Sequence, residues 1–224
     1  LTAQGVLAGC SAVTSLPDVS EFPTLTLAGW KQWFIQAAAL GAVTSTIRFT
    51  PFVVKLPVRP PALVAKQASS VAYLTNNRFA MGVGTSSWPE DYDFMGVDFK
   101  RRGKRMDECM DIIRGLTTGE YFEFHGEFYD IPKIKMTPAP TEPIPMLVGG
   151  HADAALRRAV IRGDGWMHGG GPGEELDALL DKIADIRKAE GKTNDPFEIH
   201  VISMDAYTAD GCKRLSDKGV TDVI

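Results

Sequence analysis

The chain has 224 residues, of which 44% are hydrophobic and 23% are charged, the composition of an ordinary globular protein with one full-sized core. The formal net charge is −4 and the Lys and Arg residues are spread along the chain, so the electrostatic signature of a nucleic-acid partner is absent. No apolar run approaches the roughly 18 residues of a membrane-spanning helix, and no signal-peptide pattern opens the sequence. We therefore expect a cytoplasmic protein with no membrane partner.

Strand and helix signals alternate after a loop-like segment at residues 1–25. Helical spacing of apolar residues predicts helices over residues 27–43, 62–74, 104–119, 152–162, 174–190 and 210–218. Runs rich in β-branched and aromatic residues predict strands near residues 47, 80, 146, 166, 200 and 222. Every strand except the last precedes a helix.

Individual residues refine these elements. Trp30, Trp33 and Phe34 of the first helix are interpreted as core. Pro51 interrupts the first strand, residues 46–56, and indicates an edge, a bulge or a bend. The second strand, residues 78–85, is followed by a loop with Trp88, and lacks the third glycine of a dinucleotide-binding fingerprint.

The segment over residues 121–136 alternates aromatic and polar residues around His125, which predicts a β-hairpin outside the main sheet. His125 is interpreted as a turn residue, and His200, on a later strand, as packed between strand and helix rather than catalytic. Three isolated cysteines, Cys10, Cys109 and Cys212, show neither metal-type spacing nor a pairing framework. We expect free thiols without a catalytic role, and no metal site.

Strict alternation of strands and helices implies a parallel sheet, and this many units point to a (β/α)8 TIM barrel, with an open doubly wound sheet as the alternative. A barrel needs two further strands before residue 46, and the sequence stops inside the last strand. We therefore expect a single domain, residues 1–224, that is incomplete at both ends and folds poorly alone. A cooperative unfolding transition of this chain would argue against that expectation.

Gly149 and Gly150 separate an apolar strand from an Ala-rich helix within a strand-helix-strand unit, residues 144–170. Unpaired amides and the helix dipole favour an anion at such a helix start, although an αβ turn without any ligand also uses Gly. In a barrel, the carboxyl ends of the strands carry the site. That face would collect residues 51–54, 84–87, 149–152 and 166–170.

Four ordered blocks resemble the bacterial luciferase-like monooxygenase family, and are most similar to its class that uses the deazaflavin F420. These blocks are residues 56–67, 78–108, 124–130 and 143–167. The resemblance implies a TIM barrel that binds F420 or FMN at the carboxyl face and acts on a small-molecule substrate, usually as a homodimer. F420 would exchange a hydride with a substrate carbon, whereas reduced FMN would activate oxygen in a monooxygenase.

By position, the resemblance implies that Gly149, Gly150 and His151 hold the cofactor phosphate through backbone groups. Ala152 stands where relatives often have Ser, so one hydroxyl contact is missing. Trp166, at the end of the next strand, would face the reacting end of the cofactor or its rim.

The resemblance also places Gly84 and Thr85 beside the cofactor ring. Pro51, Phe52 and Val53 correspond, to within one residue, to a bulge with a non-proline cis peptide that backs the ring. The acid or base that relatives carry on an early strand lies outside the matching part of this chain. Among the residues present, His168 is the candidate catalytic group.

Two alternatives from other classes stay open. A flavin-free, phosphate-binding TIM-barrel isomerase or aldolase would use the same glycine pair, but it usually has a Lys or an acid at a strand end, and we find none in the sequence. A non-catalytic relative would bind flavin without turnover. Absorption spectra of the purified protein, before and after substrate, separate these possibilities.

Overall fold

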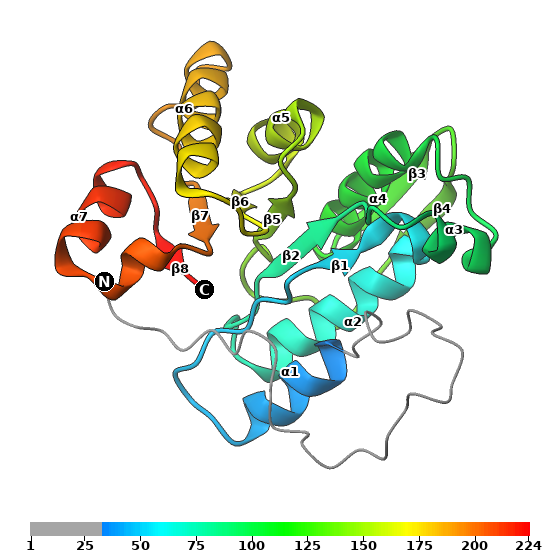
Figure 1. The fold of residues 1–224 in the computed structure, drawn as a ribbon. Coiled ribbons are helices and arrows are strands. Elements are labelled where there is room, and N and C mark those ends of the chain that lie inside the picture. Colours follow the sequence, from blue (N-terminus) through cyan, green and yellow to red (C-terminus); the bar gives the residue numbers. More distant parts are fainter. Residues whose placement is uncertain (1–32) are drawn as a thin grey trace, which may run out of the picture.

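A computed structural model describes residues 33–224, and its centre is one parallel sheet (Figure 1). The strand order is β1-β2-β5-β6-β7-β8, and every neighbouring pair is parallel. The strands are β1 (Val54–Lys55), β2 (Met81–Gly84), β5 (Met146–Gly149), β6 (Gly165–Met167), β7 (Glu198–Val201) and β8 (Asp222–Val223). Within the described residues β1 and β8 are the two edges, so the barrel is not closed.

Helices cover one face of this sheet. The helices of the described residues are α1 (Trp33–Ala42), α2 (Pro61–Leu74), α3 (Pro89–Met95), α4 (Arg102–Leu116), α5 (Asp153–Arg162), α6 (Gly173–Ala189) and α7 (Ala209–Asp217), with 3-10 turns η2 (Leu56–Val58) and η3 (Met204–Tyr207). Short α3 packs against η2 and contributes no residue to the core on this face. In the part of the chain that the structure describes, no helix has the length and apolarity needed to cross a membrane.

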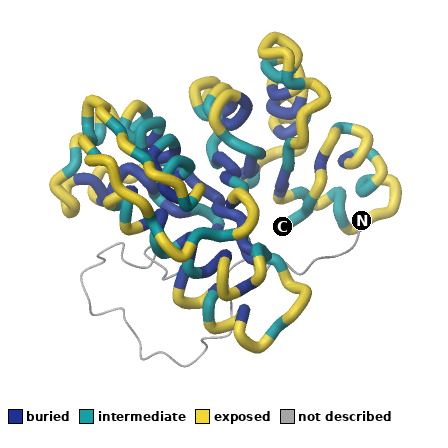
Figure 2. The backbone as a smooth tube through the Cα atoms, turned by 180° about the vertical axis from the view of Figure 1, so that it is seen from behind, coloured by how far each residue is buried: buried dark blue, intermediate teal, exposed yellow. Residues whose placement is uncertain are grey.

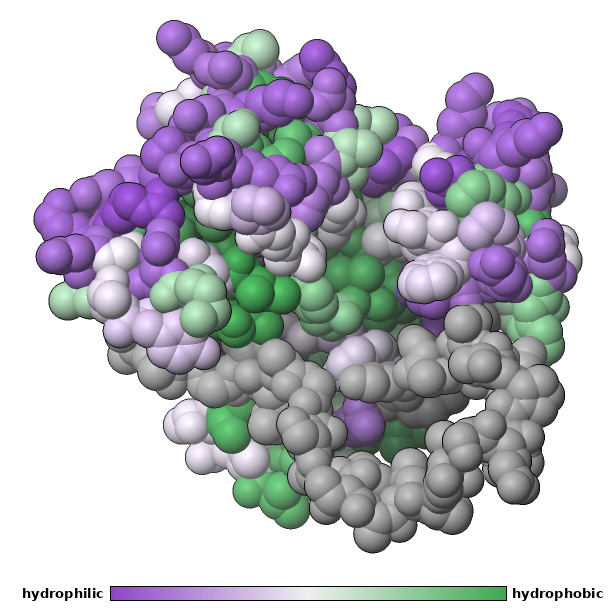
Figure 3. All heavy atoms as spheres, in the orientation of Figure 1, coloured by the Kyte–Doolittle hydropathy of each residue, from purple (hydrophilic) through white to green (hydrophobic). Residues whose placement is uncertain are grey.

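The two faces of the sheet differ because side chains alternate along each strand. Val83, Val148 and Trp166 belong to the main core cluster with the helices. Leu147 and Met167, on the opposite face, form a smaller cluster with Ala80 that contains no helix residue. Figure 2 shows buried residues along the strands and on the helix sides facing them, and Figure 3 shows hydrophobic atoms gathered in a central hollow.

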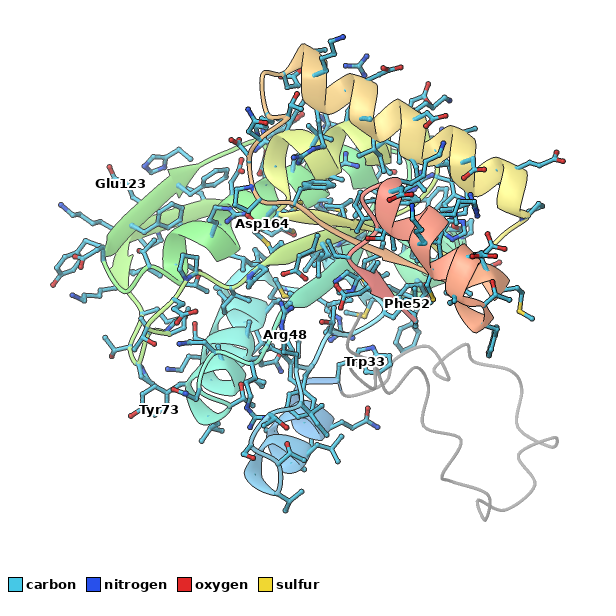
Figure 4. The ribbon with its side chains drawn as sticks, turned by 90° about the vertical axis from the view of Figure 1, so that its left-hand side faces the viewer. Trp33, Arg48, Phe52, Tyr73, Glu123 and Asp164 are labelled. Atoms are coloured by element: carbon cyan, nitrogen blue, oxygen red, sulfur yellow. The ribbon has the colours of Figure 1, made fainter. Side chains whose placement is uncertain are left out.

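The predicted hairpin is confirmed as a separate antiparallel pair, β3 (Tyr121–His125) and β4 (Asp130–Lys135). Glu108 of α4 anchors it, because its carboxylate accepts hydrogen bonds from the turn amides of Glu127 (2.7 Å), Phe128 (2.9 Å) and Tyr129 (3.2 Å). Glu123 lies on the exposed side of the hairpin (Figure 4).

Most predicted helices are confirmed within two residues, but residues 27–32, including Trp30, lie outside the described part. The first strand is a correction: only Val54–Lys55 is strand, preceded by a single bridge between Phe49 and Phe79. Pro51 has no amide hydrogen to continue a ladder. The loop predicted around Trp88 is also corrected, because α3 begins directly after this residue.

Candidate functional site

The carboxyl ends of β2 and β5 meet at Val53, the residue immediately before β1. The peptide between Phe52 and Val53 is cis, which confirms the non-proline cis peptide expected in this region. A Cβ atom added to Gly84 would lie 2.8 Å from Val53 Cγ2, and one added to Gly149 would lie 3.2 Å from Val53 Cγ1. The structure thus brings these predicted site residues together, and the two glycines leave room for the Val53 side chain.

The segment before β1 also runs close to β2. A Cβ atom at Gly82 would lie 2.0 Å from the Pro51 carbonyl oxygen, so only glycine allows this approach. The half-buried Phe52 ring packs against the small cluster of Ala80, Leu147 and Met167. Figure 4 shows Phe52 and Arg48 on this segment.

The Gly149–Gly150 turn leads into an uncapped helix. Gly150 has a φ of 127°, a conformation that residues with a Cβ atom rarely adopt. The N-cap residue of α5 is Ala152, in extended conformation and without a side-chain acceptor for the first amides. These amides and the helix dipole therefore remain available to an anion, together with the cradle residues Gly149, Gly150 and His151.

The Trp166 side chain holds the backbone of this cradle in place. Its indole Nε1–H donates a hydrogen bond to the Gly150 carbonyl at 2.9 Å, and the side chain is completely buried in the main core. The ring therefore fixes the position of Gly150 without reaching the surface. The expectation that Trp166 contacts the cofactor stays a prediction.

His151 joins the cradle to the loop after β6. Its ring stacks on His168, with centroids 4.9 Å apart and planes 13° apart. The Gly169 amide donates to His151 Nε2 at 3.2 Å, and His151 Nδ1 lies 3.3 Å from Glu175 Oε1. An accepting Nε2 leaves the proton of neutral His151 on Nδ1, directed at Glu175.

His168 is completely buried on the same side of β6 as Trp166. Its Nδ1 donates to the Ile202 carbonyl at 3.2 Å, whereas the buried Nε2 has no hydrogen-bond partner within residues 33–224. Burial first, and then the neighbouring His151, lower the pKa of His168. His168 is therefore neutral with a free lone pair on Nε2, and its predicted catalytic role stays a prediction.

Sequence reasoning missed a charged pair that lies at the carboxyl ends of the strands. Lys55, the last residue of β1, forms an ion pair with Asp91 of α3, which is 2% exposed. The Ser86 hydroxyl donates to the same carboxylate at 2.7 Å, and the Tyr92 hydroxyl donates to the Thr85 carbonyl. The expectation that no strand end carries a Lys or an acid is therefore wrong. The sequence does carry a signal for this ion pair, which is the single Lys in the apolar run VVKL, because a lysine in a buried segment needs a partner of opposite charge.

A second polar cluster lies on the helix-free face, where Glu198, His200 and Asp222 come within reach of one another. The expectation that His200 packs between strand and helix is therefore wrong, because its neighbours Ile199 and Val201 occupy the helix side of β7. Imidazole and carboxylates could ligate a divalent metal. Burial lowers the pKa of His200, but hydrogen bonds from His200 to Asp222 and Glu198 outweigh it and raise the pKa to about 9. Arg48 also contacts Glu198, at 2.9 Å. The positive charges of His200 and Arg48 therefore balance the negative charges of Glu198 and Asp222.

Similar proteins span a greater length than this chain. An uncharacterized protein of Mycobacterium tuberculosis is 70% identical over 191 residues, which cover 85% of this chain and 66% of that protein. An F420-dependent glucose-6-phosphate dehydrogenase of Amycolatopsis mediterranei is 26% identical over 162 residues, covering 70% of this chain and 49% of the dehydrogenase. The chain therefore spans between half and two thirds of these relatives.

A solved structure shares the fold. It is the oxygenating constituent of a type II Baeyer–Villiger monooxygenase of Pseudomonas putida in complex with FMN, with a TM-score of 0.62 and 18% identity over 75% of this chain and 51% of that one. The profile described as luciferase-like monooxygenase matches residues 24–214. With its parallel α/β sheet, its cis peptide immediately before β1 and this match, the chain belongs to the luciferase-like monooxygenase family.

Proposed function

We propose that this chain forms the cofactor-holding part of an F420-dependent oxidoreductase that transfers a hydride to or from a small organic substrate. The cradle of Gly149, Gly150 and His151 carries the proposal, because backbone amides at an uncapped helix start suit a phosphate. When bound, the deazaflavin would supply the carbon that gives or takes the hydride. The resemblance to the F420-dependent dehydrogenase adds support.

The residues present fit such a cofactor at both of its ends. At the phosphate end, Gly150 adopts a backbone conformation open to glycine, and Trp166 holds its carbonyl. At the ring end, the Phe52–Val53 cis peptide and Gly84 would form the wall against which the ring lies, with Thr85 at its edge. The protein would thus orient the cofactor while Val53 and the small cluster beneath it exclude water.

An FMN-dependent monooxygenase is the second candidate. The related solved structure contains FMN, and the phosphate cradle would serve either cofactor. We also expect a cytoplasmic homodimer, which stays a proposal.

The test is a fluorescence titration of the protein with F420 and, separately, with FMN. We expect saturable binding of F420, tighter than that of FMN. Tighter binding of FMN would favour the monooxygenase. Binding of neither cofactor would remove the basis of both proposals and favour a flavin-free phosphate-binding protein, which inorganic phosphate would then reveal by stabilising the fold.

A further inference from the structure

The protonation states of the stacked pair His151 and His168 follow from fixed partners. The Ile202 carbonyl can only accept, so His168 carries a proton on Nδ1, while its buried Nε2 has no hydrogen-bond partner in the described part of the chain. The Gly169 amide can only donate, so His151 Nε2 is bare and its proton lies on Nδ1. The hydrogen bonds thus place a proton on Nδ1 of each ring, although His151 belongs to the cradle for an anion.

The two rings differ in how readily they accept a further proton. Protonating His151 at Nε2 would remove the acceptor for the Gly169 amide. Protonating His168 at Nε2 breaks no hydrogen bond, because this buried atom has no partner among the described residues. A buried acceptor without a donor is costly, and a proton would turn it into a donor. His168 is therefore the ring at which a proton binds with the smallest structural change.

Glu175 of α6 places a negative charge near the free nitrogen of His168. A Cβ atom at Gly171 would lie 3.0 Å from Glu175 Oε2 and 3.8 Å from His168 Nε2, so both atoms flank the same point. The carboxylate of Glu175 acts on His168 through its negative charge, which favours a proton on the imidazole, and no ion pair joins the two side chains in the structure of residues 33–224. The absence of a side chain at Gly171 keeps the space open.

We propose that His168 takes up a proton at Nε2 when an anionic group binds at the cradle of Gly149, Gly150 and His151, so that binding itself creates a positive charge beneath the ligand. This inference rests on the proposed function of the cradle. An anion within about 6 Å favours the protonated form of an imidazole. His168 would thus be a binding residue for the phosphate end of the cofactor, rather than an acid or base at the substrate.

The surroundings explain why the proton is absent before binding. The titratable groups that face His168 are His151, from the turn before α5, and Glu175, from α6, while β6 contributes the Trp166 ring and the segment after β7 contributes the Ile202 carbonyl. Burial and the stacked His151 both disfavour an imidazolium, and the hydrogen bond to Ile202 together with the charge of Glu175 only partly offsets them. A second negative charge would tip this balance.

Isothermal titration calorimetry tests the proposal. Sulfate, which does not titrate near neutral pH, and the cofactor that binds in the fluorescence titration would each be added in buffers of different ionisation enthalpy. The dependence of the observed heat on the buffer gives the number of protons taken up. We expect uptake of up to one proton per bound anion at neutral pH, and affinity that weakens up to tenfold for each pH unit above neutrality.

Two variants assign the proton to its site. His168→Asn keeps a donor for Ile202 but cannot titrate, and it should bind the anion with no proton uptake. Glu175→Gln, at a half-exposed position, keeps the fold and should reduce the uptake even if His168→Asn fails to fold. His125→Gln, on the exposed hairpin, is the matched control and should behave like the wild type.

The outcomes separate this inference from the proposed function. Anion binding without proton uptake, or uptake that survives in His168→Asn or is unchanged in Glu175→Gln, would overturn the role of His168 and leave the cradle intact. No binding of sulfate, FMN or F420 would overturn the cradle itself, and this inference with it.

Discussion

Alkaline pH should weaken the fold through His200. The imidazole is 3% exposed and bridges Glu198 on its own strand, at 2.9 Å, and Asp222 on β8, at 3.2 Å. A pKa raised from 6.5 to about 9 corresponds to roughly 3 kcal/mol of stabilisation by the protonated form. This is a large part of the stability of a typical domain.

The stabilisation by His200 decreases as the pH rises. Because the pKa of His200 is higher in the folded state, the stabilisation is fully present below pH 6.5 and is lost as the pH rises through about 9. Hydrogen bonds from His200 lower the pKa values of Glu198 and Asp222, so their contribution is present at neutral pH and is lost on acidification. The ion-paired state should therefore be most stable near neutral pH.

Urea unfolding of the wild type and of His200→Gln, from pH 6 to pH 10, measures this effect. At pH 6 the variant should be less stable by about 3 kcal/mol, because the two carboxylates lose the imidazolium that bridges them and only Glu198 keeps a cation, Arg48. The gap should close towards pH 10, where the wild type loses the same charge. His125→Gln should show no gap at any pH. A gap for His200→Gln that stays constant across this range would refute the assignment of an imidazolium.

Three further substitutions test local packing and charge. Ala152→Ser should stabilise the protein by about 1 kcal/mol in urea unfolding, because the N-cap already has extended geometry and lacks only the hydroxyl acceptor; no gain would argue against this cap geometry. Lys55→Met should lower the free energy of unfolding by about 3–5 kcal/mol, because it removes the cation that pairs with the buried Asp91 carboxylate. The added change Asp91→Asn should restore much of this stability, and equal losses in the single and double variants would contradict the ion pair. Gly82→Ala should lower the melting temperature markedly because its Cβ would meet the Pro51 carbonyl, whereas Gly173→Ala, with open space around it, should not; equal melting temperatures would contradict the close approach.

Regular periodicity made most of the fold predictable. The strand-helix-strand unit around Gly149 was expected with its helix at residues 152–162, and α5 spans Asp153–Arg162. The amphipathic pattern also located α6 and the alternating aromatic residues located the hairpin. Short α3 was missed, although Pro89 at its start and the left-handed Gly96 at its end are helix boundary signals.

Contacts between distant residues were not predictable from local patterns. Lys55 and Asp91 are 36 residues apart in sequence, and only the packing of α3 beside the end of β1 brings them together. The stacking of His151 on His168 likewise depends on two loop conformations. The cis peptide at Phe52–Val53 was expected from the family resemblance, because no residue pattern encodes it outside proline.

The most direct test of the phosphate cradle compares cofactor binding by the wild type and Gly150→Ala. The φ of 127° at Gly150 is strained for alanine, at a cost of about 1–3 kcal/mol, so the turn should reorient and its amides should turn away from the ligand. We predict saturable binding of F420 or FMN by the wild type and at least tenfold weaker binding by Gly150→Ala, with an unchanged circular dichroism spectrum. Equal affinities of the two proteins would contradict a cradle at Gly149, Gly150 and His151.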